Sequence, residues 1–227
     1  EVYFVGENGQ GKSNILESLY YSSYGVSFRT HTESQIIKKN QKNFSINSIY
    51  KKNDEIQKVS IIYDEGKKRI EKNGKKIVDR KELINTIPCI LFCHDDMRFA
   101  TGEPENRRFF IDQSLTLYDS LYIDDLRNYK KILKSRNLIL KSHQYEMLDV
   151  YDNQLAQQGL IIQEKRKKAI FLFNQIFGKI YAEITGIEGL TIHYGTSWKS
   201  ENEKITYEEI LKILESKREQ DKTFETT

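Results

Sequence analysis

Cysteine, proline and long apolar runs are all scarce in this chain of 227 residues. Its two cysteines are too few for a disulfide scaffold and suit a reducing compartment, which predicts a cytoplasmic protein. No stretch approaches the roughly 20 consecutive apolar residues that a membrane helix requires. No basic segment followed by an apolar run indicates a signal peptide. We therefore expect no membrane partner.

The chain also lacks a large excess of charge of either sign. The net charge is only +3, from 36 Lys and Arg against 33 Asp and Glu, so a DNA-binding surface must come from a local patch. Aromatic residues reach 11%, which excludes a disordered chain. The chain begins at Glu1, inside an apolar run, and ends in the polar segment 217–227. We interpret it as a piece of a longer protein.

The first hundred residues alternate the signals of strands and helices. Apolar runs at Val2–Val5 and Ile87–Phe92 predict two buried strands. Alternation of period two, together with turn signals, predicts an antiparallel meander; its strands are 44–50 and 58–63, and its turns are Asp64–Gly66 and Asn73–Gly74. Between the first run and the meander, residues 12–24 have helical spacing, with an apolar face of Ile15, Leu16, Leu19 and Tyr20.

The second half is permissive for helices because no proline follows Pro104. A helix is expected over 115–141, where apolar residues recur at steps of four, three and four: Tyr122, Leu126, Tyr129 and Leu133. A later helix carries Ile162, Ala169, Phe173, Phe177, Ile180 and Ile184. The two faces predict the seam of an antiparallel helical hairpin, although an ordinary bundle core has the same spacing.

One motif has a direct chemical meaning. The eight residues after the first apolar run match G-x-x-x-x-G-K-[ST] in full: Gly6, Glu7, Asn8, Gly9, Gln10, Gly11, Lys12 and Ser13. Glycines let the loop turn its backbone N–H groups inward, toward phosphate oxygens. Lys12 would add a charge at the β- and γ-phosphates, and the Ser13 hydroxyl would bind Mg²⁺. The motif therefore predicts a nucleotide site. ATP is the default because no Asn-Lys-x-Asp guanine motif is present.

A phosphate loop of this kind also needs a carboxylate for Mg²⁺ or the attacking water. The candidate is Asp96, in Asp95–Asp96 after the second apolar run, with a helix N-cap as its alternative role. The run is interrupted by His94, which favours a junction loop over a strand of the Walker B type. Cys89 and Cys93 have no second pair, which argues against a zinc site.

Several motifs together resemble one family, the bacterial recombination mediators called RecF, within the SMC/Rad50 class of ABC-type ATPases. They occur in the same order as in that family. The resemblance extends from residue 2 to about residue 186, and a fainter resemblance continues to residue 227. The resembling segments are Gly6–Ser13 with Asn14–Ser18, Ser27–Thr30, Phe92–Met97, Gly102–Asp112, Tyr129–Lys141 and Tyr151–Gly159.

The resemblance implies an α/β fold, namely a P-loop ABC-type ATPase head with a mixed sheet and an antiparallel meander, plus a helical-hairpin arm. The corresponding division is 1–103 for the N-terminal part of the head, 104–186 for the arm and 187–227 for a return segment. The family binds ATP and Mg²⁺, forms ATP-dependent head-to-head homodimers, and hydrolyses ATP slowly. It acts on gapped DNA in replication, recombinational repair and the SOS response, with RecR as partner.

Two departures from the family pattern limit what is expected of this chain. Asp95 stands where the family has a glutamate, so the carboxylate sits on a shorter side chain. The family's signature segment and Walker B strand lie beyond the last residue, and its opening strand lies before the first. We therefore expect weak nucleotide binding, or none, and no efficient hydrolysis from this piece alone.

Candidate DNA contacts come from local charge. Residues 67–81 hold eight basic and two acidic side chains, and Lys72, Lys75 and Lys76 are the candidates for sequence-independent contact with phosphates. A solvated hairpin is the equal alternative. Arg29 is a candidate for phosphate or DNA contact, or else a salt-bridged arginine. The run Lys165–Lys168 is expected to be a solvated helix face.

Three further arginines have structural interpretations. Arg107 and Arg108 are expected to pair with Asp112 or with the head, and Arg136 with Asn137 predicts a buried interhelical network. Two other functions remain open: a small-molecule kinase with a P-loop, and a non-catalytic scaffold that keeps the fold.

Overall fold

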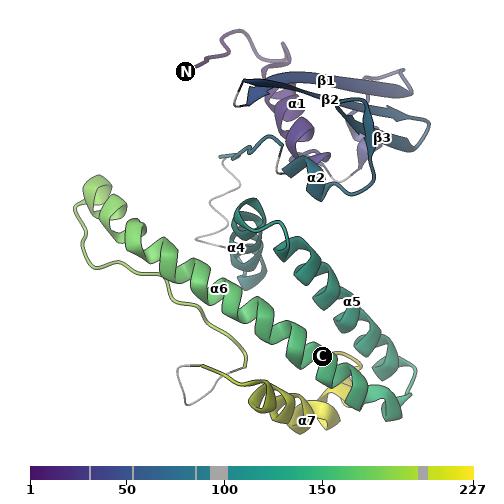
Figure 1. Ribbon diagram of the computed structural model, residues 1–227, viewed down its shortest axis with the longest axis vertical. Coiled ribbons are helices and arrows are strands. Elements are labelled where there is room, and N and C mark those ends of the chain that lie inside the picture. Colours follow the sequence, from purple (N-terminus) through teal and green to yellow (C-terminus); the bar gives the residue numbers. More distant parts are fainter. Residues whose placement is uncertain (31, 53, 85, 93–101, 199–203) are drawn as a thin grey trace. The chain divides into compact units, whose positions relative to one another are not determined.

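The computed structural model describes residues 1–30, 32–52, 54–84, 86–92, 102–198 and 204–227. The chain divides into two compact units, Glu1–Arg98 and Phe99–Thr227, and Figure 1 shows the sheet in the first and the long helices in the second. The fold class is the expected α/β type with a helical part. The finer division at 103 and 186 stays a prediction.

The first unit contains a four-stranded antiparallel sheet in the order β1-β2-β3-β4, which confirms the predicted meander. Its elements are α1 (Lys12–Tyr24), η1 (Glu33–Gln35), β1 (Asn43–Lys52), β2 (Glu55–Asp64), β3 (Lys67–Lys72), β4 (Lys75–Ile77) and α2 (Lys81–Ile84). Both predicted turns have two central residues at positive φ, with Asn73 at 50° and Gly74 at 75°. Such turns match the twist of the flanking strands and so fix the register.

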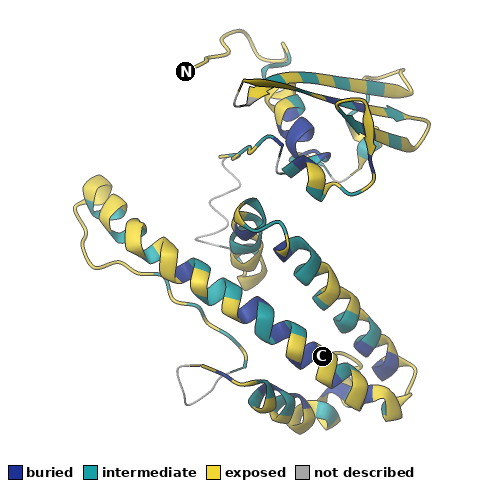
Figure 2. Ribbon diagram, in the orientation of Figure 1, coloured by how far each residue is buried: buried dark blue, intermediate teal, exposed yellow. Residues whose placement is uncertain are grey.

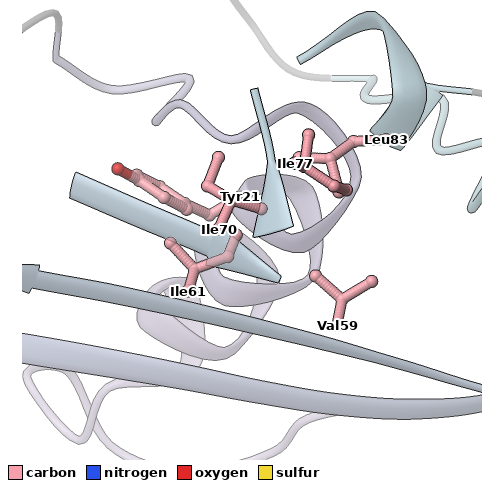
Figure 3. Close-up of a cluster of buried hydrophobic side chains, with 6 residues drawn as sticks. All are labelled: Tyr21, Val59, Ile61, Ile70, Ile77 and Leu83. Atoms are coloured by element: carbon pink, nitrogen blue, oxygen red, sulfur yellow. The ribbon is translucent and has the colours of Figure 1, made fainter. Parts of the chain in front are cut away.

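The core of this unit lies between one face of the sheet and the C-terminal half of α1. Six buried side chains form it, and Figure 3 shows them converging: Tyr21, Val59, Ile61, Ile70, Ile77 and Leu83. Val59 and Ile61 are buried on β2, and the residues beside them are exposed or half-buried, as expected for a sheet with one solvated face. Gly25 ends α1 at a φ of 65°, which places the chain beneath Ile70 and Leu83.

The buried face of α1 differs from the predicted one. Ile15, Leu16 and Leu19 are 44%, 48% and 53% exposed, whereas Tyr20 and Tyr21 are buried. Figure 2 shows the colour of buried residues on α1, next to the sheet. The bounds of the helix are as predicted. The sheet packs against its last turns, so the stripe that begins at Ile15 has no sheet beneath it.

The two predicted buried strands are also wrong. Val2–Val5 and Ile87–Phe92 are irregular, and Val5, Ile90 and Phe92 are 94%, 86% and 90% exposed. A strand needs a neighbour for its backbone groups. All strand pairing among the described residues lies within the meander, so neither segment gains one.

The second unit is helical. It comprises α4 (Pro104–Tyr118), α5 (Tyr122–Lys141), η3 (Tyr145–Met147), α6 (Leu148–Thr185) and α7 (Tyr207–Phe224). The single helix expected over 115–141 is two helices. Asp119 is extended, and its carboxylate accepts a hydrogen bond from the Leu121 backbone N–H at 3.0 Å, which offers the chain a turn instead of a continued helix.

The predicted hairpin is formed by α5 and α6, which lie side by side and are joined by residues 142–147 (Figure 1). Tyr122 and Ile162 are buried at its seam, with Leu126, Tyr129 and Ala169 packed around them. The seam was predicted to continue to Ile184, which is instead 78% exposed. The reason is length, since α5 has 20 residues and α6 has 38.

A return segment, 187–198, runs back along α6. The Asn174 side chain donates to Ile192 O at 2.8 Å and accepts from Ile192 N at 2.9 Å, which fixes the two chains against each other. Further along, the indole of Trp198 lies on Gly159. A Cβ at Gly159 would be 2.3 Å from the ring, so this position requires glycine for close approach.

The predicted network at Arg136 is confirmed. Its guanidinium is fully buried and donates to Asp152 at 2.6 Å and to Asp221 at 2.7 Å. Arg218 also binds Asp152, at 2.6 Å, and Asn137 accepts from Thr227 N at 3.0 Å. One arginine of α5 thus connects α6 and α7.

Candidate nucleotide-binding site

The phosphate-loop residues form a connected turn that ends in the first turn of α1. Gly9 and Gly11 have φ angles of 83° and 87°, which residues with side chains rarely adopt, so the glycines of the motif are required by the backbone. Gly11 is the N-cap and accepts from Asn14 N at 2.9 Å. No side chain caps the helix at this end, so the N–H groups of its first turn face an open loop.

Lys12 lies over this loop. Its ammonium donates to Gly6 O at 2.7 Å and to Glu7 O at 2.6 Å, so the side chain folds back across the turn. The first turn of α1 carries no acidic residue. A full positive charge and the positive end of a helix therefore act on the same space, which favours an anion. The Ser13 hydroxyl beside Lys12 is exposed.

Arg29 reaches the same helix turn from the segment after α1. Its guanidinium donates to Asn14 Oδ1 at 3.0 Å and to Glu17 Oε2 at 3.1 Å. Glu17 is 8% exposed and also accepts from the Ser27 hydroxyl. The salt-bridged alternative for Arg29 thus describes its contacts, yet half of its side chain, 51%, stays exposed next to the loop.

Glu17 is a residue that sequence reasoning missed. It binds the 27–29 segment to α1 one turn after Ser13. The available signal was the i, i+3 spacing of Asn14 and Glu17, which places both on the helix face that Arg29 approaches.

The metal assignment divides in two. Ser13 is exposed in the first turn of α1, and its role as a ligand of Mg²⁺ stays a prediction. Asp95 and Asp96, with His94 and Cys93, lie outside the described residues. Within the described ranges, no group of three or more His, Cys, Asp or Glu side chains could hold a metal ion.

The three DNA-candidate lysines do not share one face of the sheet. In the β3–β4 register Lys72 pairs with Lys75 and Glu71 with Lys76, so Lys76 lies on the face opposite the other two. Lys72 also donates to the Thr86 hydroxyl at 2.8 Å. Lys75 and Lys76 are exposed.

Two other charge predictions differ in part from the structure. Arg166 binds Asp112 through two nitrogens at 2.8 and 2.7 Å, and Lys165 binds Asp119 and Asp125 at 2.7 Å each. The run at Lys165–Lys168 is therefore not simply a solvated face. Asp112 has Arg166 as an ion-pair partner, because α6 packs on α4 at this point. No ion pair of Asp112 with Arg107 or Arg108 is found among the described residues, and the alternative pairing of these arginines with the head stays a prediction.

Burial shapes the acid–base behaviour of the side chains around the C-terminal half of α1. It raises the pKa of Tyr24 to about 12, and the phenol donates to Cys89 O. Burial and then the hydrogen bond to Glu33 raise the pKa of Tyr21 well above its usual range. Burial likewise raises the pKa of the Cys89 thiol, so this cysteine is a poor nucleophile.

No family model matches the sequence, but individual proteins do. It is 42% identical to the DNA replication and repair protein RecF of Treponema pallidum over 223 residues, which are 97% of this chain and 62% of the relative. The proteins of the same name in Clostridium botulinum (Okra) and Clostridium perfringens (SM101) are 35% and 37% identical, over 96% of the chain and 61% of theirs.

Comparison with solved structures also finds RecF proteins. A structure of the recombination mediator protein RecF with ATP superposes with a TM-score of 0.89 at 26% identity, covering 97% of this chain and 61% of that one. A second RecF structure, with the analogue ATPrS, gives 0.88 at 27% identity and covers 98% and 62%. None of the helices in the described ranges has the length and hydropathy of a membrane span. The chain spans about three fifths of the length of these relatives, and over that part it is similar to the RecF proteins in sequence and in fold.

Proposed function

We propose that this chain provides the ATP-binding loop of a DNA repair protein of the RecF type. The observation that carries the proposal is the position of Lys12 over Gly6 O and Glu7 O, beside the uncapped start of α1. A triphosphate would replace the two carbonyls as the partner of the ammonium. The named relatives, and the ATP in one matched structure, favour adenine nucleotide.

Two residues next to the loop have proposed roles in this site. Ser13 is the proposed protein ligand of Mg²⁺, which would neutralise charge on the β- and γ-phosphates. Arg29 is the proposed positioning residue for the first turn of α1, because it binds both Asn14 and Glu17. Asp96 remains the proposed carboxylate on the metal or water side.

For the whole protein we propose ATP-dependent, sequence-independent binding of gapped DNA, with a homodimer formed around two nucleotides, slow hydrolysis, and RecR as partner. The order of the motifs from Gly6 to Gly159, together with the likeness to a mediator of the RecFOR pathway, supports this assignment. Contact with DNA is proposed through phosphates, because the exposed Lys75 and Lys76 offer charge without a base-reading element.

The decisive experiment replaces Lys12 with alanine in the full-length parent protein and measures binding of a fluorescent ATP analogue with and without Mg²⁺. Removing the ammonium should weaken binding at least about tenfold, since a charge-assisted bond is worth roughly 1.5–3 kcal/mol. Lys38→Ala is the matched control, because Lys38 is in the same unit but outside the loop. Equal affinity in wild type and Lys12→Ala would exclude the loop as the nucleotide site.

A second experiment tests the hairpin. Charge reversal at Lys75 and Lys76 should flatten the dependence of DNA affinity on salt, because fewer counterions are released. Lys72→Glu is informative as a separate variant, because its ammonium already binds Thr86. An unchanged salt slope in the Lys75→Glu/Lys76→Glu protein removes the hairpin from the DNA surface.

A further inference from the structure

A buried carboxylate, that of Glu17, lies about one helical turn beyond the phosphate loop. Ser13, the last residue of the loop motif, precedes it by four positions in α1, which is about 6 Å along the helix axis. Glu17 is only 8% exposed, so water screens its charge poorly. A phosphate in the loop would lie at the positive N-terminal end of α1. A negative charge on Glu17 would repel that phosphate.

Glu17 is held in place by the segment that follows α1. The Ser27 hydroxyl donates to its Oε1, and the Arg29 guanidinium donates to its Oε2 at 3.1 Å. Ser27 is itself 6% exposed, and its hydroxyl oxygen accepts from the backbone N–H of Arg29 at 2.9 Å and of Thr30 at 3.2 Å. The carboxylate cannot turn away from α1 without breaking these hydrogen bonds.

Arg29 supplies the charge that balances this carboxylate. In the part of the chain that the structure describes, it is the one cation in ion-pair contact with Glu17. The same nitrogen, Nη1, also donates to Asn14 Oδ1 at 3.0 Å, which places the guanidinium on the first turn of α1. Glu17 and Arg29 together therefore carry no net charge toward the loop.

These contacts favour one of two roles for Arg29. A guanidinium that moved to a bound phosphate would give up both Asn14 and Glu17. It would leave the Glu17 carboxylate buried without a counter-charge, which is strongly unfavourable. A guanidinium that stays on Glu17 keeps its hydrogen bonds and removes the repulsion between that carboxylate and the phosphates.

We propose that Glu17 and Arg29 form a charge-neutral positioning pair beside the nucleotide. Arg29 permits triphosphate binding by cancelling the Glu17 carboxylate, and it does not itself contact the phosphates. This inference rests on the proposed nucleotide site. Its consequence has a definite sign: loss of the cation alone weakens ATP binding, loss of the carboxylate alone strengthens it, and loss of both restores it.

The test measures the affinity of the full-length parent protein for a fluorescent ATP analogue in the presence of Mg²⁺. Arg29→Met should weaken binding at least about fivefold, because an uncompensated charge with little exposure is poorly screened. Glu17→Gln should strengthen binding by about two- to fivefold. The double variant Glu17→Gln/Arg29→Met should return to within about twofold of wild type. The matched control is Glu55→Gln, an exposed acid of the same unit, which should change affinity less than about twofold.

Arg29→Lys gives a second readout, because it keeps the charge and removes the planar fork of the guanidinium. Its affinity should stay within about threefold of wild type, since a charge near Glu17 is all that the pair requires. This variant and Glu17→Gln also decide the question if Arg29→Met does not fold.

Three outcomes would overturn the inference. A double variant that binds as weakly as Arg29→Met would show that Arg29 acts on the phosphates directly, as would a loss of more than about tenfold in Arg29→Lys. Weaker binding in Glu17→Gln would show that Glu17 has only a structural role. If Lys12→Ala binds the analogue as well as wild type, the proposed nucleotide site itself fails and this inference fails with it. The behaviour of Lys12→Ala thus separates the two failures.

Discussion

The strongest test of the helical unit is the replacement of Arg136 by methionine. The guanidinium is fully buried and binds Asp152, which is also fully buried, and Asp221, which is 10% exposed. Methionine fills a similar volume without charge. It would leave two carboxylates in the interior, one of them without an ion-pair partner.

The size of the effect follows from which partners remain. Removing one member of a buried ion pair typically costs about 3–5 kcal/mol, because the other charge is left uncompensated. Asp152 would still bind Arg218, at 2.6 Å. Most of the lost stability therefore arises at Asp221. Among the described residues, one nitrogen of Arg136 has no hydrogen-bond partner, which reduces the stabilisation that the network gives the wild type. We therefore expect a loss at the lower end, about 3 kcal/mol in the free energy of unfolding.

The chain offers its own probe for this measurement. Its single tryptophan, Trp198, packs on α6 at Gly159, so its emission follows the helical unit and not the sheet. In urea titrations, the unfolding midpoint of Arg136→Met should lie at a clearly lower urea concentration than the midpoint of the wild type. The matched control is Lys134→Met, an exposed lysine on the same helix, for which we expect a change within about 0.5 kcal/mol.

A double-variant cycle gives the refutation. Arg136→Met combined with Asp221→Leu should recover part of the stability, because the uncompensated carboxylate is then absent. A loss below about 1 kcal/mol in Arg136→Met, or no recovery in the double variant, would show that the three helices are not held together by this charge network.

Three further outcomes are expected. Gly11→Ala should destabilise the sheet unit by about 1 kcal/mol and weaken ATP binding, because φ there is 87°; circular dichroism and nucleotide titration check this. Gly159→Ala should shift the emission of Trp198 to longer wavelength by displacing its ring. The hydrogen bond from Lys165 lowers the pKa of Asp119, so its contribution to stability is present above the unfolded pKa, about 3.9, and is lost as pH falls through the lower folded value. Asp119→Asn should therefore flatten the acid limb of a stability–pH curve.

Local signals predicted the parts of the fold that are themselves local. Asn73–Gly74 fixed a hairpin because both residues tolerate positive φ, and the structure has them at 50° and 75°. Helix α1 begins after Gly11 and ends at Gly25, as its sequence spacing indicated. Short-range geometry also explains the missed break at Asp119, where an aspartate forms a turn without any proline or glycine.

Burial was harder to predict, because it depends on partners that are distant in the sequence. Helical spacing identified an apolar stripe on α1, yet Leu19 is 53% exposed and Tyr21 is buried. Periodicity shows that a stripe exists, whereas the position of the sheet decides which stripe is covered. The Arg136 network was predicted as such, but its partner Asp221 lies 85 residues away and carries no sequence signal.

The same limit applies to charge, and it bears directly on DNA binding. Two basic runs, 67–81 and 165–168, look alike in the sequence, but the fold divides each of them. Lys68 is engaged with Glu33 and Gly25 O in the core of the sheet unit, and Arg166 is held by Asp112. A charge that already has a carboxylate within 3 Å attracts phosphate far less than its count suggests. A DNA surface on this chain should therefore be sought among exposed lysines such as Lys75 and Lys76. The dependence of DNA affinity on salt concentration in variants of these lysines measures how much positive charge is free to contact phosphates.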